Sequence, residues 1–187
     1  LKRRLFRSQQ DSEGGVYWSF DTTSISSYSE TIRKVSYGYS KENPELPQIN
    51  LGLIVSESSG EPLYYKVLEG SLSDPLALRQ MLVDTANLKS SDVSLVMDRI
   101  FSSPTLLDRL YEQNLGFICG SKTNLSYCKS VLTNFEPLLR VGGLDTFLDE
   151  YSVQAKTAST TWTYRDPTTG HQERRSLFIH VYLDPFR

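Results

Sequence analysis

The chain lacks long hydrophobic runs, a cysteine framework and a glycine-rich phosphate loop. Its longest purely apolar run, at residues 53–55, is far too short to cross a bilayer, so no membrane association is expected. Cys119 and Cys128 have no second pair, so they form neither a zinc pattern nor a disulfide framework. A reduced, cytoplasmic setting follows as the expectation. No secretory signal is visible, although the chain begins with Leu1 rather than methionine.

Excess positive charge is also lacking. With 20 Lys and Arg against 22 Asp and Glu, the net charge is −2, which is a poor electrostatic footprint for a nucleic-acid-binding domain. The one basic cluster, at residues 2–7, is typical of a solvated segment. The 187 residues, 39% of them hydrophobic, are enough for one domain with a substantial core.

Alternation of apolar and polar residues predicts the strands. They are expected at residues 16–21, 47–56, 62–68, 92–98 and 116–120, with a polar loop over 27–46 between the first two. Two further alternating segments, 161–165 and 177–183, flank a strong turn signal at 166–170 and predict a second hairpin.

Helical spacing of apolar residues predicts three helices. Asp74 is a natural N-cap and Pro75 suits the first helical position, so one helix is expected to begin there. Another begins at Ser103 and Pro104, and a third carries an apolar stripe at 128–135 that is expected to end before Pro137. Three antiparallel strands followed by helix–strand units predict an α/β fold with a ribonuclease-H-like mixed sheet. In that topology the first and fourth strands are neighbours.

Asp21 and Asp98 each close one of these two apolar strands. A buried strand end is a costly place for charge, and it is where open α/β sheets hold ligands. Two adjacent carboxylates could hold Mg²⁺ or Mn²⁺, and a two-metal site activates water or a 3′-hydroxyl against a phosphodiester. A third carboxylate normally completes such a site. The remaining candidates lie in segments that resemble helix surface or loop: Glu112, Glu136, Asp145, Asp149, Glu150 and Glu173.

Other interpretations of the same residues remain open. Asp21 could cap its strand end by binding the backbone of Thr23 or Ser24. Asp98 could pair with Arg99 or cap the start of a helix. A weaker candidate is a hydrolase site, in which His171 or His180 would act with Ser24, Ser26 or Ser27, although the sequence has no nucleophile elbow. Another is a phosphate contact by Lys122, whose position is more typical of a solvated side chain.

Several stretches together resemble, in the same order, the catalytic core of prokaryotic insertion-sequence transposases of the DDE class, nearest to the IS-four-type superfamily. They are FDTTSIS at 20–26, YGYSK at 37–41, LPQINL at 46–51, PLYY at 62–65, LEG at 68–70 with Asp74, LVMDRIFS at 95–102 and LFIHVY at 177–182. The likeness covers nearly the whole chain.

The resemblance implies that Asp21 and Asp98 are the first two members of a catalytic triad and bind Mg²⁺ or Mn²⁺. It implies DNA cleavage and strand transfer on transposon-end DNA, and leaves a homodimer open. Residues 1–15 would end an upstream segment, 16–140 would form the first part of the ribonuclease-H-like core, and 141–187 would begin an insertion region. The C-terminal helix with the catalytic glutamate would be missing.

Two departures from the family pattern favour alternatives. Ile100 stands where the family usually has glycine, and a β-branched residue would be strained there if the position requires a positive φ. The chain also stops at Arg187, before the glutamate helix. One alternative is a non-catalytic remnant, at most a folded binding or dimerising piece. Another is a related ribonuclease-H-like nuclease that cleaves without strand joining.

Overall fold

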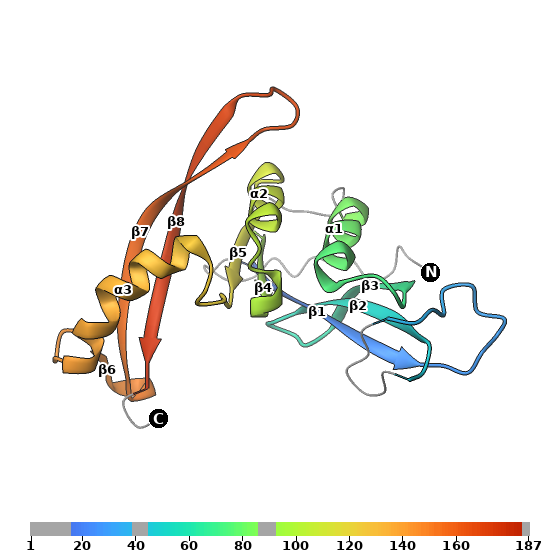
Figure 1. Ribbon diagram of the computed structural model, residues 1–187, viewed down its shortest axis with the longest axis horizontal. Coiled ribbons are helices and arrows are strands. Elements are labelled where there is room, and N and C mark those ends of the chain that lie inside the picture. The colour runs from blue at the N-terminus through green and yellow to red at the C-terminus, as the bar shows by residue number, and fades with distance from the viewer. Residues whose placement is uncertain (1–15, 39–44, 86–92, 185–187) are drawn as a thin grey trace. The chain divides into compact units, whose positions relative to one another are not determined.

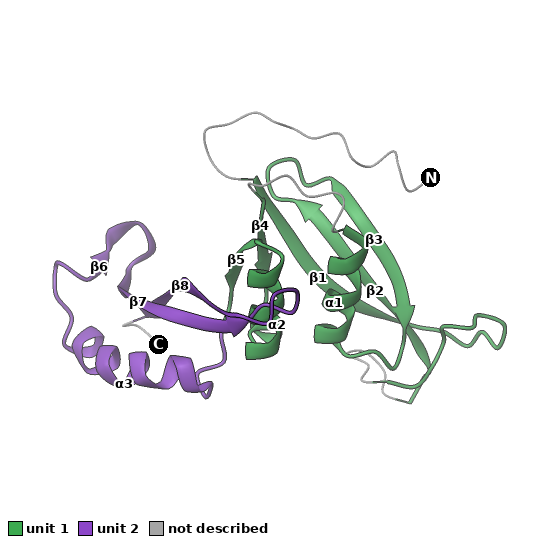
Figure 2. Ribbon diagram, turned by 90° about the horizontal axis from the view of Figure 1, so that it is seen from above, with its two compact units in different colours: residues 1–120 green, residues 121–187 purple. Residues whose placement is uncertain are grey.

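The computed structural model describes residues 16–38, 45–85 and 93–184. The chain divides into two compact units, residues 1–120 and 121–187, which are described separately (Figure 2). The basic cluster at 2–7 and the expected upstream segment 1–15 lie outside the described residues. No helix in the described ranges is both long and apolar enough to cross a membrane.

The first unit is built on a five-stranded sheet with the strand order β3-β2-β1-β4-β5 (Figure 1). β1 pairs antiparallel with β2 and β2 with β3, whereas β4 runs parallel to β1 and β5 parallel to β4. This confirms the ribonuclease-H-like mixed sheet and the adjacency of the first and fourth strands. The bounds are β1 Val16–Ser26, β2 Gln48–Ser56, β3 Pro62–Glu69, β4 Val93–Met97 and β5 Gly116–Cys119.

One face of this sheet is covered by helices. They are α1 (Asp74–Thr85), α2 (Pro104–Glu112) and the short 3₁₀ turn η2 (Arg99–Phe101). Gly52 of β2 allows α1 to approach closely, because a Cβ there would lie 2.2 Å from the Met81 sulfur. The core between helices and sheet contains Phe20, Ile54, Leu68, Leu78, Met81, Leu95, Phe101 and Leu110.

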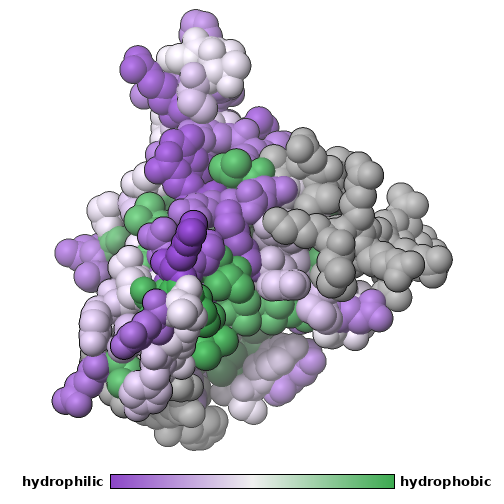
Figure 3. All heavy atoms as spheres, turned by 90° about the vertical axis from the view of Figure 1, so that its right-hand side faces the viewer, coloured by the Kyte–Doolittle hydropathy of each residue, from purple (hydrophilic) through white to green (hydrophobic). Residues whose placement is uncertain are grey.

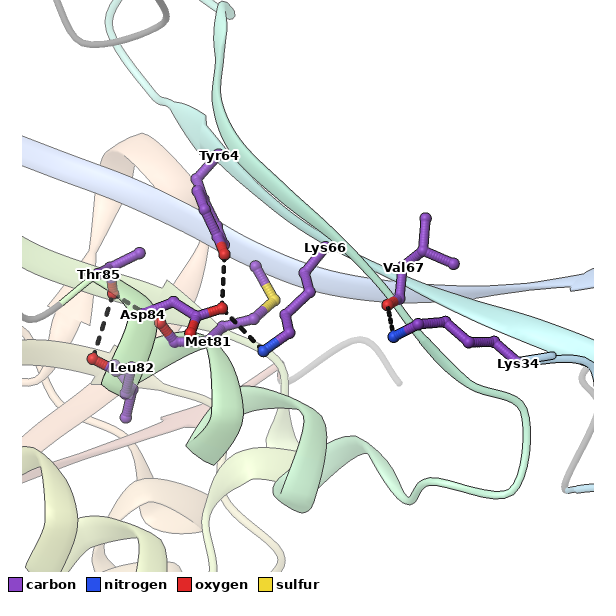
Figure 4. A network of polar contacts seen from close by, with 8 residues as sticks. All are labelled: Lys34, Tyr64, Lys66, Val67, Met81, Leu82, Asp84 and Thr85. Carbon is purple, nitrogen blue, oxygen red and sulfur yellow. Dashed lines mark hydrogen bonds and ion pairs between the residues drawn. The ribbon is translucent and has the colours of Figure 1, made fainter. Parts of the chain in front are cut away.

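α1 is fastened to the sheet by a small polar network (Figure 4). One oxygen of Asp84 accepts a hydrogen bond from the Tyr64 hydroxyl at 2.7 Å and pairs with Lys66 at 2.8 Å. Burial, followed by the hydrogen bond to Asp84, raises the pKa of Tyr64 to about 12. The phenol therefore stays protonated and keeps donating at neutral pH, which fixes the C-terminal half of α1 over β3.

The opposite face of the sheet carries apolar residues of β2 and β3, and no described element of the first unit covers it. On β2, the helix-covered face buries the polar Gln48 and Asn50, while Leu51 and Leu53 on the other face are only half-buried. Tyr65 is 54% exposed on that same face, since it pairs with Leu53. On the side of the molecule drawn in Figure 3, hydrophobic residues gather in a patch that hydrophilic residues border. This uncovered face matters because Asp21 belongs to it.

The buried polar side chains of β2 have a structural role. Asn50 donates to the Leu72 carbonyl at 2.8 Å, and Gln48 donates to the Gly70 carbonyl at 3.0 Å. The Ser24 hydroxyl donates to Asn50 at 3.0 Å. These bonds hold the segment that leads into α1 against the ends of β1 and β2, so the polar residues anchor a connection.

The second unit packs α3 (Ser126–Val141) against a long hairpin of β7 (Val153–Arg165) and β8 (Gln172–Leu183). A two-residue strand, β6 (Phe147–Leu148), pairs with the start of β7, and a 3₁₀ turn, η3 (Asp149–Tyr151), links them. The hairpin turn is fixed by the Asp166 carboxylate, which accepts the backbone N–H groups of Thr168 and Thr169. The expected hairpin is confirmed, and its strands are longer than predicted.

Two local predictions need correction. α3 continues through Pro137, because burial of Leu139, which is 2% exposed, offsets the hydrogen bond that proline cannot donate. Asp74 is the first residue of α1, and its carboxylate accepts the Thr22 hydroxyl at 2.6 Å. α3 groups with the hairpin in the second unit, so the contacts divide the chain after Gly120. The division into residues 16–140 and 141–187 stays a prediction about domain organisation.

Candidate active site

Asp21 and Asp98 lie side by side at the carboxyl ends of two parallel strands. The last pair in the β1–β4 register is Phe20 with Met97, and each aspartate is the next residue. Phe20 and Met97 are buried toward the helices, so both aspartates belong to the opposite, uncovered face and are exposed. Neighbouring strands are about 4.8 Å apart, which places the two carboxylates within reach of one cation. The predicted juxtaposition is confirmed.

Each aspartate uses one oxygen to bind the backbone that follows it. Asp21 Oδ1 accepts the Thr22 N–H at 2.7 Å, and Asp98 Oδ1 accepts the Arg99 N–H at 2.5 Å. Asp98 is thus the N-cap of η2, which confirms the capping interpretation, whereas Asp21 binds Thr22 rather than Thr23 or Ser24. The salt-bridge contacts of the described residues include no Asp98–Arg99 pair. These bonds fix both carboxylates and leave one oxygen of each for a ligand.

A pair of phenylalanines supports the two aspartates from the core. Phe20 precedes Asp21, and Phe101 closes η2 after Asp98. Their rings meet edge to face with centroids 5.0 Å apart, and Phe101 is fully buried. Because each ring is anchored close in sequence to one aspartate, the contact ties the end of β1 to η2.

Ile100 is not strained by its backbone. It lies in the middle of η2, and the only non-glycine residues with positive φ among those described are Asn114 and Ser152. The side chain is 36% exposed. The departure from glycine at this position therefore does not displace Asp98 through backbone strain.

Cys119 is a neighbour of the pair that the sequence analysis missed. It ends β5, in register with Met97, and its thiol donates to the Asp98 carbonyl at 3.3 Å and to the Gly120 carbonyl at 3.0 Å. Burial, and then the charge of Asp98, raises the pKa of Cys119 to about 11. The thiol is therefore protonated and acts as a donor that holds the backbone of Asp98. Its position next to Asp98 follows from the parallel β4–β5 register, which the sequence pattern alone does not give.

No third acid joins the pair within the described residues. Across residues 16–38, 45–85 and 93–184 there is no group of three or more His, Cys, Asp or Glu side chains able to hold a metal ion. Glu112 is paired with Arg109 and Glu136 with Arg140, each at 2.7 Å. Asp145, Asp149, Glu150 and Glu173 belong to the second unit. Two carboxylates suit Mg²⁺ or Mn²⁺, but they form only part of a cage.

The weaker candidates have other partners. Ser24 is bound to Asn50, and Ser27 accepts the backbone N–H of Ser29 at 3.1 Å. His180 is hydrogen-bonded to Thr157 across the hairpin at 2.8 Å. Lys122 is exposed in the turn between β5 and α3. Nothing in these contacts favours a serine hydrolase.

No family model and no curated protein matches the chain. Among solved structures it is similar to the Mos1 transposase paired-end complex with left transposon end, at 12% identity over 68% of this chain and 48% of that one, with a TM-score of 0.38. A piggyBac transposase synaptic complex with hairpin DNA matches at 12% identity over 88% and 33%, with a TM-score of 0.48. Ciona intestinalis endonuclease V in complex with DNA matches at 16% over 70% and 58%, with a TM-score of 0.36.

The chain therefore spans between a third and about three fifths of the length of these solved structures. At such identities the likeness concerns the fold alone. The assignment of the fold depends on the strand order and the strand directions, and the assignment of the site depends on the register that aligns Asp21 with Asp98.

Proposed function

We propose that this chain is the catalytic-core part of a DDE transposase of the IS-four type that its sequence resembles. Asp21 and Asp98 are two of its metal-binding, catalytic carboxylates, and transposon-end DNA is its substrate. The observation that carries this proposal is their position, one residue beyond the Phe20–Met97 pair on parallel neighbouring strands. A homodimer and a cytoplasmic setting are further expectations of the same proposal.

The chemistry assigned to each residue follows from its contacts. Bound Mg²⁺ or Mn²⁺ would activate a water or a 3′-hydroxyl and stabilise the leaving oxygen. Asp21 and Asp98 would each offer the carboxylate oxygen that does not accept a backbone N–H. The Phe20–Phe101 contact and the Cys119 thiol would keep the two carboxylates in place, so that little reorganisation accompanies metal binding.

The third carboxylate is proposed to come from an element that packs on the uncovered face of the sheet. Two observations support this. Asp21 and Asp98 both belong to that face, and β2 presents Ile49, Leu51, Leu53 and Val55 to it. Apolar rows of this kind are normally buried against a helix or a second sheet. An amphipathic helix placed there would bring an acidic side chain to the site from the side the two aspartates face.

Metal binding tests the proposal directly. Mn²⁺ binding to the 187-residue chain is measured by calorimetry for the wild type, Asp21→Asn, Asp98→Asn and the control Glu57→Gln, whose carboxylate is exposed in the β2–β3 turn. Each aspartate variant is expected to lose at least about tenfold in affinity, because it removes one of two charged ligands. Equal affinity in all four proteins would contradict the proposed site.

Cleavage provides the second test. With two carboxylates in place of three, we expect no nicking of supercoiled plasmid by this chain in Mn²⁺. A chain extended by a helix that supplies a glutamate is expected to nick, and Asp21→Ala in it should abolish the activity. Nicking by the 187-residue chain alone would show that the site is already complete.

A non-catalytic remnant is the second candidate, favoured by the lack of a third acid among the described residues. It predicts that Asp21→Ala changes neither Mn²⁺ affinity nor any activity of the extended chain. The metal titration therefore separates the two candidates before any DNA substrate is needed.

A further inference from the structure

The outer face of the β7–β8 hairpin carries a row of exposed rings. Phe178, His180 and Tyr182 alternate along β8, and we name them the aromatic stripe. Phe178 is 60% and Tyr182 is 62% exposed, and His180 is exposed as well. The three rings thus occupy alternate positions on one exposed face of β8.

The strand register shows that the aromatic stripe faces away from α3. Trp162 meets Tyr127 of α3 at 5.3 Å, and Lys156 lies over the ring of Phe135 of α3 at 5.5 Å. Even-numbered residues of β7 therefore face the helix, which lies beside the hairpin in Figure 1. The stripe pairs with the odd-numbered residues of β7, so it belongs to the other face.

The surroundings of the stripe are polar, with no aliphatic side chain larger than alanine among its cross-strand partners. Across from the rings are Ala155, Thr157 and Ser159. The Thr157 hydroxyl is 2.8 Å from Nδ1 of His180 and fixes the imidazole ring. A face built from isolated rings between hydroxyls differs from a protein-docking face, whose centre is contiguous and apolar.

A hollow of about 330 Å³ opens at one end of the stripe, next to His180 and Tyr182. Besides residues of the stripe and their cross-strand partners, it is lined by Asp145, Thr146, Leu148 and Lys156, so it offers acceptors and one cation. This volume is at the small end of the range of ligand sites, about 300–1,000 Å³. A carboxylate and hydroxyls in such a hollow accept hydrogen bonds from amino and imino groups, which are the groups on the edges of nucleobases.

Positive charge lies at the other end of the stripe, toward the hairpin turn. Arg174 pairs with Thr163 and Arg165 pairs with Gln172, which places both arginines on the same face as the rings. Both side chains are exposed. Their charge is complementary to phosphate groups that run along the strand.

We propose that the aromatic stripe binds a short single-stranded nucleic acid, with unpaired bases stacked on its rings. Alternate residues of a strand are about 6.6 Å apart, which is close to the spacing of successive bases in an extended single strand. Base–aromatic stacking is tolerant of sequence, and flanking arginines contact the backbone. This surface is distinct from Asp21 and Asp98, and it binds without a metal.

Fluorescence anisotropy with a labelled oligothymidine of about 12 nucleotides tests this inference on the 187-residue chain, at low salt and in EDTA. The double variant Phe178→Leu and Tyr182→Leu keeps apolar surface but removes both π-faces. Binding is expected to weaken at least tenfold, because each stacked ring contributes several-fold or more. The control Tyr151→Leu removes a ring of the same unit that is 67% exposed, and should change binding less than twofold.

Salt dependence provides a second readout. Arg174→Ala should lower the slope of log K against log salt by about 0.7, the value for one phosphate contact on a single strand. The inference is overturned if oligothymidine does not bind, or if the leucine variant binds as the wild type does. It is also overturned if a duplex binds more tightly than the single strand, or if the leucine variant turns a dimer into a monomer on light scattering.

The test is independent of the proposed catalytic function. Asp21→Asn should bind oligothymidine as the wild type does, because Asp21 belongs to the first unit and the assay contains no metal. Loss of Mn²⁺ binding with intact oligothymidine binding would separate the two sites. Loss of Mn²⁺ binding in Asp21→Asn, together with no oligothymidine binding by the wild type, would uphold the metal site and reject the stripe.

Discussion

Phe101 is expected to be the residue on which the geometry of the two aspartates most depends. It is fully buried in η2, three residues after Asp98, and its ring meets Phe20 edge to face at 5.0 Å. Truncation of a buried phenylalanine to alanine typically destabilises a domain by about 3–5 kcal/mol. The lost edge-to-face contact accounts for about 0.5–1.5 kcal/mol of this. We therefore expect Phe101→Ala to lower the free energy of unfolding of the first unit by about 4 kcal/mol.

Urea denaturation measures this change for the first unit alone. The chain has one tryptophan in each unit, Trp18 and Trp162, so a Trp162→Phe background leaves Trp18 in β1 as the only indole. The matched control is Ile100→Ala in the same turn. Its side chain is 36% exposed, so the expected loss is below about 1 kcal/mol.

A milder substitution connects stability with function. Phe101→Leu keeps most of the apolar volume and should destabilise by about 1–1.5 kcal/mol, leaving the first unit folded. Mn²⁺ affinity should nevertheless fall, because η2 loses the ring that ties it to β1. If Phe101→Ala and Ile100→Ala destabilise equally, or if Phe101→Leu leaves Mn²⁺ affinity unchanged, then the aromatic pair does not hold the aspartates in place.

Three further predictions concern local structure. The pKa of Tyr64 is about 12 in the folded chain and about 10 in the unfolded chain, so the free energy of unfolding should fall between about pH 10 and about pH 12. Tyr64→Phe should remove this part of the fall, as measured by urea denaturation at each pH. Asp166→Ala should destabilise the hairpin, because its turn loses two hydrogen bonds; urea denaturation with Trp162 as the only indole measures the change. Pro137→Ala should stabilise the second unit by about 1–2 kcal/mol in the same assay, because the helix regains a hydrogen bond. If Asp166→Ala and Pro137→Ala leave the free energy of unfolding unchanged, then neither the turn hydrogen bonds nor the proline in α3 affects stability.

Strand order and the aspartate pair were accessible from the sequence because short alternating runs leave few alternatives. β1, β2 and β3 each show period-two patterning and helix signals precede β4 and β5; this element order is that of the ribonuclease-H-like fold, in which the first and fourth strands are neighbours. Once that order is known, Asp21 and Asp98 must be neighbours at one edge. The prediction needed no knowledge of side-chain packing.

Features that depend on long-range packing were not accessible. The alternation in β2 does not tell which face is covered, and the covered face is the one with Gln48 and Asn50. Cys119 lies next to Asp98 only because of the β4–β5 register. Pro137 predicts a helix end by local rules, yet α3 continues past it and buries Leu139. In each case a tertiary contact overrides a local preference.

The uncovered face links the stability of the first unit to its proposed chemistry. Asp21 of β1 pairs with Leu53 of β2, and Leu53 pairs with Tyr65 of β3. The Asp21 carboxylate therefore borders an apolar surface that water reaches. A helix that packs on this surface would remove that water and lower the local dielectric constant, which strengthens carboxylate–metal attraction. The same packing would bury Leu51 and Val55, at about 25 cal/mol for each Å² removed from water. Covering this face is therefore expected to raise stability and Mn²⁺ affinity together. An extended chain that gains stability without any gain in affinity would show that the third ligand comes from elsewhere.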